Sequence, residues 1–127
     1  MKYLLDTHAA KWALDDVAKL SNKVKDILGD TSLHLCVSLA CAWEIAIKIG
    51  IGKLNFEGGS AVFIDKLSQF CVEILHVEGA HIAGVEKLPL LHRDPFDRIL
   101  ISTAIVEGMT IITADENIQK YDVPWIW

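Results

Sequence analysis

The chain has 127 residues, of which 52% are hydrophobic and 23% are charged. Chains that stay disordered are poor in apolar residues, so this composition excludes an intrinsically disordered protein. The 12 basic and 17 acidic residues give a net charge of −5, whereas a protein that coats nucleic acid without specificity would be basic. We therefore expect one domain, residues 1–127, built around a single core.

The cysteine content and the apolar runs indicate a cytoplasmic protein without membrane contact. The odd number of thiols, all in apolar surroundings and without a C-x-x-C pair, predicts reduced, buried side chains at Cys36, Cys41 and Cys71. The longest apolar stretch, 33–49, contains Glu44 and Lys48, whereas a membrane span needs about 20 residues with few or no charges. The apolar run at the amino end is broken by Asp6, so no signal peptide is expected.

Short apolar runs alternate with helical segments along the chain. In chain order we expect a strand at 2–5, helices at 7–14 and 22–28, a strand at 33–37, a helix from 39 to Gly50 or Gly52, a helix at 61–70, a strand at 72–77, a weaker helix at 79–88, a helix at 95–107, and strands at 109–113 and 124–127. Helix N-caps are predicted at Ser21, Ser38, Ser60 and Asp94. Apolar strands between helices are typical of an α/β fold. We expect a mostly parallel central sheet of four to five strands, flanked by helices.

Four acidic residues occur where a ligand site is expected, because open α/β sheets bind ligands beyond the carboxyl ends of their strands. Asp6 follows the first strand and Asp115 follows the fourth. Asp97 lies in the first turn of its helix, and Glu44 lies in the helix after the second strand. We expect these carboxylates to converge on one edge of the sheet. The alternative is that Asp6 and Asp115 only cap the helices that follow them.

The two other acidic positions can also be weighed against simple structural roles. Asp94-Pro95-Phe96-Asp97 is typical of a helix start, which assigns Asp94 to the N-cap and leaves Asp97 for the crevice. Glu44 can pair with Lys48 one turn later, which would stabilise the helix by only a few tenths of a kcal/mol. A buried Glu in an otherwise apolar helix is costly unless it is paired or binds a metal, so we favour a functional role for Glu44.

Converging carboxylates require a cation. Two of them about 4 Å apart repel by roughly 4 kcal/mol at an effective dielectric of 20. Ligands that are all oxygen favour Mg²⁺ or Mn²⁺ over zinc. Zinc would require histidines, and no H-x-x-x-H spacing occurs among His8, His34, His76, His81 and His92. The sequence also lacks a G-x-S-x-G motif, a cysteine beside a base and a glycine-rich phosphate loop.

Four stretches together carry a resemblance that spans nearly the whole chain. They are Tyr3-Leu-Leu-Asp-Thr-His8, Ser38 with Trp43-Glu-Ile-Ala-Ile-Lys48, His92-Arg-Asp-Pro-Phe-Asp-Arg98 and Ile111-Ile-Thr-Ala-Asp115. In this order and spacing they resemble PIN-domain ribonucleases and, within them, the VapC-like toxins of bacterial toxin–antitoxin pairs. The resemblance implies that the catalytic and metal-binding acids are Asp6, Glu44, Asp97 and Asp115. Additional candidate site residues are Asp94, Thr113 and Arg98.

The resemblance further implies an endoribonuclease that depends on Mg²⁺ or Mn²⁺ and hydrolyses RNA with a metal-activated water. It implies a homodimer and a cognate VapB-like antitoxin that inserts a segment into the active-site groove. One alternative is a PIN-like domain that binds RNA or protein without cleaving it. Another is a receiver-type phosphorelay domain, but the third strand lacks the required Asp and no Lys follows the fifth. Phosphate contacts are candidates at Lys11, Lys48, Lys53, Arg93 and Arg98, whose spacing encodes no base preference.

Overall fold

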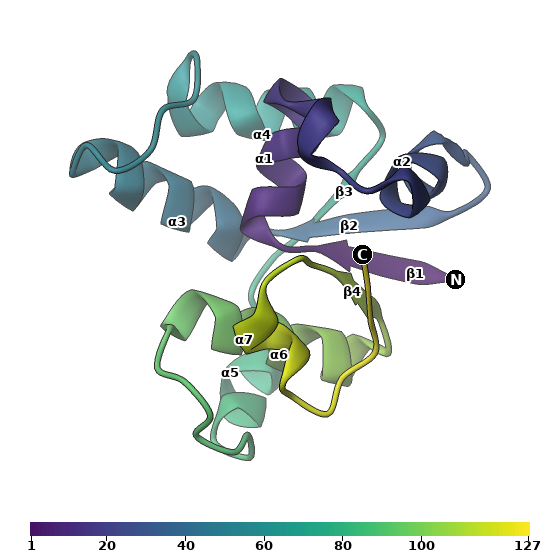
Figure 1. Ribbon diagram of the computed structural model, residues 1–127. Coiled ribbons are helices and arrows are strands. Elements are labelled where there is room, and N and C mark those ends of the chain that lie inside the picture. Colours follow the sequence, from purple (N-terminus) through teal and green to yellow (C-terminus); the bar gives the residue numbers. More distant parts are fainter.

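The computed structural model describes residues 1–127, and five parallel strands form one central sheet (Figure 1). The strands are β1 (Lys2–Leu5), β2 (His34–Ser38), β3 (Glu73–Leu75), β4 (Thr110–Ile112) and β5 (Trp125–Ile126). Their spatial order is β3–β2–β1–β4–β5, and every neighbouring pair is parallel. The predicted α/β fold class is therefore confirmed, including the fifth strand.

Helices cover both faces of the sheet (Figure 1). On one face lie α1 (Thr7–Asp15), α2 (Asn22–Gly29), α3 (Leu39–Gly50) and α4 (Gly59–Gln69). On the other lie α5 (Gly79–Val85), α6 (Pro95–Glu107) and α7 (Glu116–Gln119). A 3-10 turn, η1 (Val17–Lys19), follows α1; neither η1 nor α7 was predicted. No helix has both the length and the apolar character that crossing a membrane requires.

The central strands are buried on both faces, which explains their continuous apolar sequences. Leu4 and Ile111 are neighbours across β1 and β4, and both are fully buried. Val37 on β2 and Phe63 on α4 belong to the same core. Burying an aliphatic or aromatic side chain of this size stabilises the fold by roughly 1.5–3 kcal/mol. The core therefore holds the strand ends in fixed positions.

Three of the four predicted helix N-caps are confirmed. Ser21 accepts the N–H of Val24 and Ser38 accepts that of Ala40, while Asp94 accepts two N–H groups at the start of α6. The prediction for Ser60 is wrong, because α4 begins two residues earlier than predicted, with Gly58 as its N-cap. Gly58 has φ +86°, and a Cβ there would lie 2.4 Å from the side chain of Val62. Only glycine fits this position, because it adopts a positive φ readily and has no Cβ to clash with Val62. The start of α4 therefore depends on the conformational freedom of Gly58.

The burial of the three cysteines differs from the prediction at one position. Cys36 and Cys41 are free and buried, as predicted, but Cys71 is free and exposed. Cys71 lies in the turn between α4 and β3 with φ +59°, and such turns run over the surface. β3 itself is shorter than predicted, with three residues. The apolar character around Cys71 therefore belongs to its neighbours and not to its own environment.

The strand order creates a crevice between β1 and β4. The chain proceeds from β1 to β2 and β3 on one side, and then returns to add β4 and β5 on the other side. Ligands of open α/β sheets bind at such a reversal, outside the carboxyl ends of the two central strands. The order also excludes a receiver domain, whose strands run 2-1-3-4-5.

Candidate active site

Asp6 and Asp115 lie beyond the carboxyl ends of β1 and β4, where the strand order reverses. Asp6 follows β1 directly, and its N–H donates to the carbonyl of Ile112 at the end of β4 at 3.1 Å. Thr113 joins the two acids, because its hydroxyl donates to Oδ2 of Asp6 at 2.5 Å and accepts the N–H of Asp115 at 3.0 Å. One buried threonine therefore positions two of the four acids.

Both acids also cap helices, as the structural alternative predicts. Oδ1 of Asp6 accepts the N–H of Ala9 in α1, and Oδ1 of Asp115 accepts the N–H of Asn117 in α7; both distances are 2.8 Å. Capping uses only one oxygen of each carboxylate. It also holds each acid rigidly at the first turn of a helix, where the helix dipole favours negative charge. Capping and a functional role are therefore compatible at these positions.

Glu44 is buried in α3 and fully paired. Its Oε1 accepts the hydroxyl of Thr7 at 2.5 Å, and its Oε2 accepts the ammonium of Lys48 at 2.6 Å. The pair one helical turn apart is thus formed. Burial alone would lower the pKa of Lys48, but the hydrogen bond and charge of Glu44, together with Asp94 and Asp97, raise it. Lys48 therefore stays cationic among the acids and balances part of their charge.

Asp97 projects from the first turn of α6 and is oriented by a histidine. Nε2 of His92 lies 2.9 Å from Oδ2 of Asp97, and Nδ1 of His92 lies 2.8 Å from the hydroxyl of Tyr121. Asp94, by contrast, is occupied as the N-cap through Oδ1, at 2.9 Å from the N–H of Phe96. The division of roles between the two acids therefore agrees with the helix-start pattern in the sequence.

The acids influence one another electrostatically. Burial raises the pKa of Asp97 to about 6; the hydrogen bond from His92 opposes this, and three further carboxylates add to it, those of Asp94, Asp115 and Glu44. Burial also raises the pKa of Asp6, against the hydrogen bonds from Thr113 and Ala9, and the charge of Asp115 raises it further. Asp115 thus acts on both Asp6 and Asp97, which joins the acids into one anionic site.

An aromatic wall adjoins the acids. A cleft of about 220 Å³ is lined by Asp6, His8, Trp12, Ala114 and Asp115. The ring of His8 is exposed and lies 5.6 Å from that of Trp12, and the ammonium of Lys19 lies over the same indole at 5.6 Å. Two acids and two aromatic rings lining one cleft suit a ligand that combines phosphate and flat rings.

The cationic candidates are mostly committed to partners within the chain. Lys11 pairs with Asp15 at 2.7 Å. The guanidinium of Arg98 donates to the hydroxyl of Tyr121 and the carbonyl of Pro89, both at 2.9 Å, so it braces the segment before α6. Lys53 and Arg93 are exposed.

Several residues that shape the site were not singled out from the sequence. Thr7 binds Glu44 from 37 positions away, and Tyr121 fixes His92 from 29 positions away. No local pattern reports contacts of such separation. His92 lies near Asp94 and Asp97 in the sequence, and its ring is a hydrogen-bond partner of Asp97. For Trp12, the only available signal was its place one turn after His8 on the same helix.

The carboxylates at the crevice offer only oxygen atoms, which suits a hard divalent cation, and the imidazole of His8 lines the same cleft. Burial is the main cause of the raised pKa values of Asp6 and Asp97, and the charges of neighbouring carboxylates add to it. The four carboxylates do not form a compact ligand cluster, since Glu44 and Asp97 are held by Lys48 and His92. The group of three ligating side chains whose donor atoms lie within 4.8 Å of one another is elsewhere, on β2 and β3.

The fold is similar to that of several solved structures. The chain matches VapBC2 from Rickettsia felis, bound to a DNA fragment from its promoter, with a TM-score of 0.73 and 18% identity over 99% of this chain and 98% of that one. It matches DNA-bound VapBC from Salmonella typhimurium with a TM-score of 0.69 and 13% identity, over 99% and 97% of the two chains. It matches VapBC-1 from nontypeable Haemophilus influenzae with a TM-score of 0.67 and 19% identity, over 99% of this chain and 97% of that one.

These identities establish a common fold. No curated protein matches the chain by sequence. A family model does: that of the PIN domain matches residues 3–124. PIN domains are in general nucleases that use divalent metals. With this match over nearly its whole length, the chain belongs to the PIN domain family.

Proposed function

We propose that the chain is a divalent-metal-dependent endoribonuclease and the toxin of a toxin–antitoxin pair. The observation that carries this proposal is the anionic site formed by Asp6, Glu44, Asp97 and Asp115 at the crevice between β1 and β4. All four acids that the family resemblance assigns to the site are present, which favours cleavage over mere binding of RNA or protein.

The chain's own residues divide the work of the site. Asp6 and Asp97 would hold Mg²⁺ or Mn²⁺, with Asp115 beside them and Glu44 completing the acidic wall. When bound, such a cation neutralises charge on a phosphodiester and activates water for attack. Thr113 orients Asp6, and His92 orients Asp97. Lys48 pairs with Glu44 and places a positive charge next to the acids, where a phosphate would approach.

The aromatic wall supports RNA as the substrate class. A nucleobase can stack on Trp12 while the adjoining phosphate faces Asp6 and Asp115 across the same cleft. Stacking tolerates any base, so it supplies affinity without strict sequence preference. Because the net charge is −5, phosphate binding would depend on groups near the cleft and not on an extended basic surface.

An apolar groove supports a protein partner. A cavity of about 560 Å³ between α3, α5 and α6 is lined mainly by apolar side chains, among them Trp43, Val77, Ile82, Phe96 and Ile99. Trp43 and Phe96 pack edge to face, and they are the chain neighbours of Glu44 and Asp97. An antitoxin segment lying in this groove would therefore lie next to the acids. The similar solved structures are described as VapBC or toxin–antitoxin complexes, which supports this partner.

We also propose a homodimer. Large apolar side chains outside this groove also remain exposed, including Ile51, Phe70 and Leu90 at more than 60%. Such surface is commonly covered by another protein chain. Light scattering of the purified chain at tens of micromolar tests this: a dimer is expected, and a strict monomer would contradict it.

The nuclease proposal is tested by incubating total RNA with the purified chain, with Mg²⁺, with Mn²⁺ or with EDTA. We expect cleavage with either cation and none with EDTA or with Asp6→Asn. Asp122→Asn, which removes an exposed carboxylate outside the site, is the matched control and should cleave normally. Full activity of the metal-free protein would refute the mechanism, and RNA binding without cleavage under all conditions would favour the non-cleaving alternative.

A further inference from the structure

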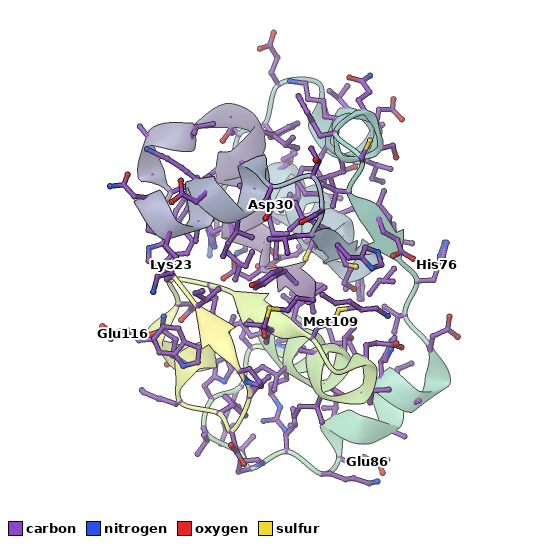
Figure 2. All side chains as sticks on the ribbon, turned by 90° about the vertical axis from the view of Figure 1, so that its right-hand side faces the viewer. Lys23, Asp30, His76, Glu86, Met109 and Glu116 are labelled. Carbon is purple, nitrogen blue, oxygen red and sulfur yellow. The ribbon has the colours of Figure 1, made fainter.

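A second cluster of ligating side chains lies at the opposite end of the sheet. His34 and Cys36 are two residues apart on β2, so both side chains point to the same face of the sheet. Glu73 is the register partner of Cys36 on the neighbouring strand β3. Figure 2 views the molecule from the side on which the strands begin, with Met109 labelled directly before β4.

The donor atoms of these three residues are already gathered. They all lie within 4.8 Å of one another. Nε2 of His34 is a hydrogen-bond partner of Oε2 of Glu73, and Sγ of Cys36 lies 3.7 Å from the same oxygen. A zinc ion with ligands at about 2.0–2.3 Å keeps its donors roughly 3.3–3.8 Å apart in tetrahedral geometry. The sulfur–oxygen separation falls in this range, and the exposed His34 and Glu73 side chains can adjust.

We propose that His34, Cys36 and Glu73 form a zinc site, in which one nitrogen, one sulfur and one oxygen bind Zn²⁺ and water fills the fourth position. This site is chemically distinct from the oxygen-only acidic site, because thiolate and imidazole select a softer cation than Mg²⁺. A thiolate, a carboxylate and a neutral imidazole fully neutralise a divalent ion, so the complex carries no net charge into the edge of the core.

Binding replaces a proton with the ion. In the metal-free chain Cys36 is a free, buried cysteine. When Zn²⁺ binds, the S–H bond breaks, the sulfur keeps the electron pair and the proton passes to solvent. No oxidant or reductant is involved.

A zinc ion bound here would link the edge strand β3 to its neighbour β2. β3 is an edge strand of only three residues, and the ion would tie it to β2 through side chains as well as the backbone ladder. At roughly 3.3 Å per residue, Cys36 lies about 7 Å and His34 about 13 Å before the end of β2 at Ser38, so the zinc site is separate from the acidic crevice. Zinc binding should therefore stabilise the fold without taking part in RNA cleavage.

The test uses Co²⁺ as a spectroscopic probe of the chelator-treated full-length chain. A thiolate ligand to Co²⁺ produces a charge-transfer band in the near ultraviolet, and we expect this band, together with its loss when Zn²⁺ is added in competition. Cys36→Ser and His34→Ala should both lose the band. His34 is exposed, so His34→Ala keeps the test valid if Cys36→Ser fails to fold.

The other two thiols are the matched controls. Cys41→Ser and Cys71→Ser should retain the band, as should Asp97→Asn in the acidic site. The proposal is overturned if wild type shows no band, if the band survives in His34→Ala, or if it disappears in Cys41→Ser or Cys71→Ser. His34→Ala should also cleave RNA like wild type, so the zinc site and the nuclease proposal can fail independently.

Discussion

The hydroxyl of Thr113 donates to the carboxylate of Asp6 at 2.5 Å, although 107 positions separate the two residues in the chain. The same hydroxyl accepts the N–H of Asp115 at 3.0 Å. Thr113 is completely buried at the end of β4, so it cannot turn to other partners. The contact therefore links the ends of β1 and β4 through side chains of the site, in addition to the hydrogen bonds of the sheet.

Thr113→Val should impair both stability and cleavage. The substitution keeps the side-chain shape but leaves a buried oxygen of Asp6 and the N–H of Asp115 without their partner, which costs about 1–3 kcal/mol. Urea denaturation and single-turnover cleavage measure the two effects. Thr103→Val is the control, because the Thr103 hydroxyl bonds only to the carbonyl of Ile99 within its own helix. Wild-type cleavage by Thr113→Val would show that the positioning of Asp6 is unimportant.

Asp97→Asn should abolish cleavage while making the metal-free protein slightly more stable. The raised pKa of Asp97 means that its negative charge is disfavoured in the fold, and an amide removes it. After allowance for solvent screening we expect a gain on the order of 1 kcal/mol in EDTA, measured by urea denaturation. Asp94→Asn should be far less harmful to cleavage, since Asn also caps helices well. If both variants are equally inactive while folded, the division of roles between them is wrong.

The stability of the metal-free protein should depend on pH through Asp97. The folded pKa of about 6 lies above the usual 3.8, so the folded state binds this proton more tightly than the unfolded state. The resulting stabilisation is complete below about pH 4 and is lost as the pH rises through about 6. Comparing wild type with Asp97→Asn in EDTA across this range isolates the contribution. A difference that does not change with pH would contradict the raised pKa.

Trp12→Leu should weaken substrate binding more than the chemical step. Leucine retains apolar packing but removes the flat indole from the cleft beside Asp115. Base stacking is worth about 1–3 kcal/mol, so KM for RNA should rise about fivefold or more with kcat little changed. Trp125→Leu replaces an exposed tryptophan on β5 and serves as the control. An unchanged KM in Trp12→Leu would remove the stacking role.

A bound antitoxin should place a cation among the four acids. Arginine suits this best, because its planar group can pair with a carboxylate through two hydrogen bonds. Replacing that cation of the antitoxin by glutamine should weaken both inhibition and affinity, measured by RNA cleavage and by calorimetry. A tryptophan-to-serine change at Trp43 in the groove should weaken affinity without altering cleavage by the free chain. Unchanged inhibition by the neutral antitoxin would contradict the charge-based mechanism.

Much of the fold could be predicted from local patterns. Continuous apolar runs identified the strands, and Ser21, Ser38 and Asp94 identified helix starts, because capping depends on residues only two or three positions apart. The start of α4 was missed, since it depends on the left-handed conformation of Gly58 and on the close approach of Val62, which leaves no room for a Cβ. The short α7 was also missed, because four residues provide too little periodicity to detect.

The sequence by itself determined which chemistry the chain can offer: acids after the strands, an all-oxygen donor set, and a helix start that separates Asp94 from Asp97. Only the tertiary structure decided which groups meet. The Thr7–Glu44 contact, the link from Tyr121 through His92 to Asp97, and the approach of Glu73 to Cys36 all join separate elements. The physical reason is that sheet order and helix packing set such contacts, and these depend on the burial of the whole core instead of on neighbouring residues.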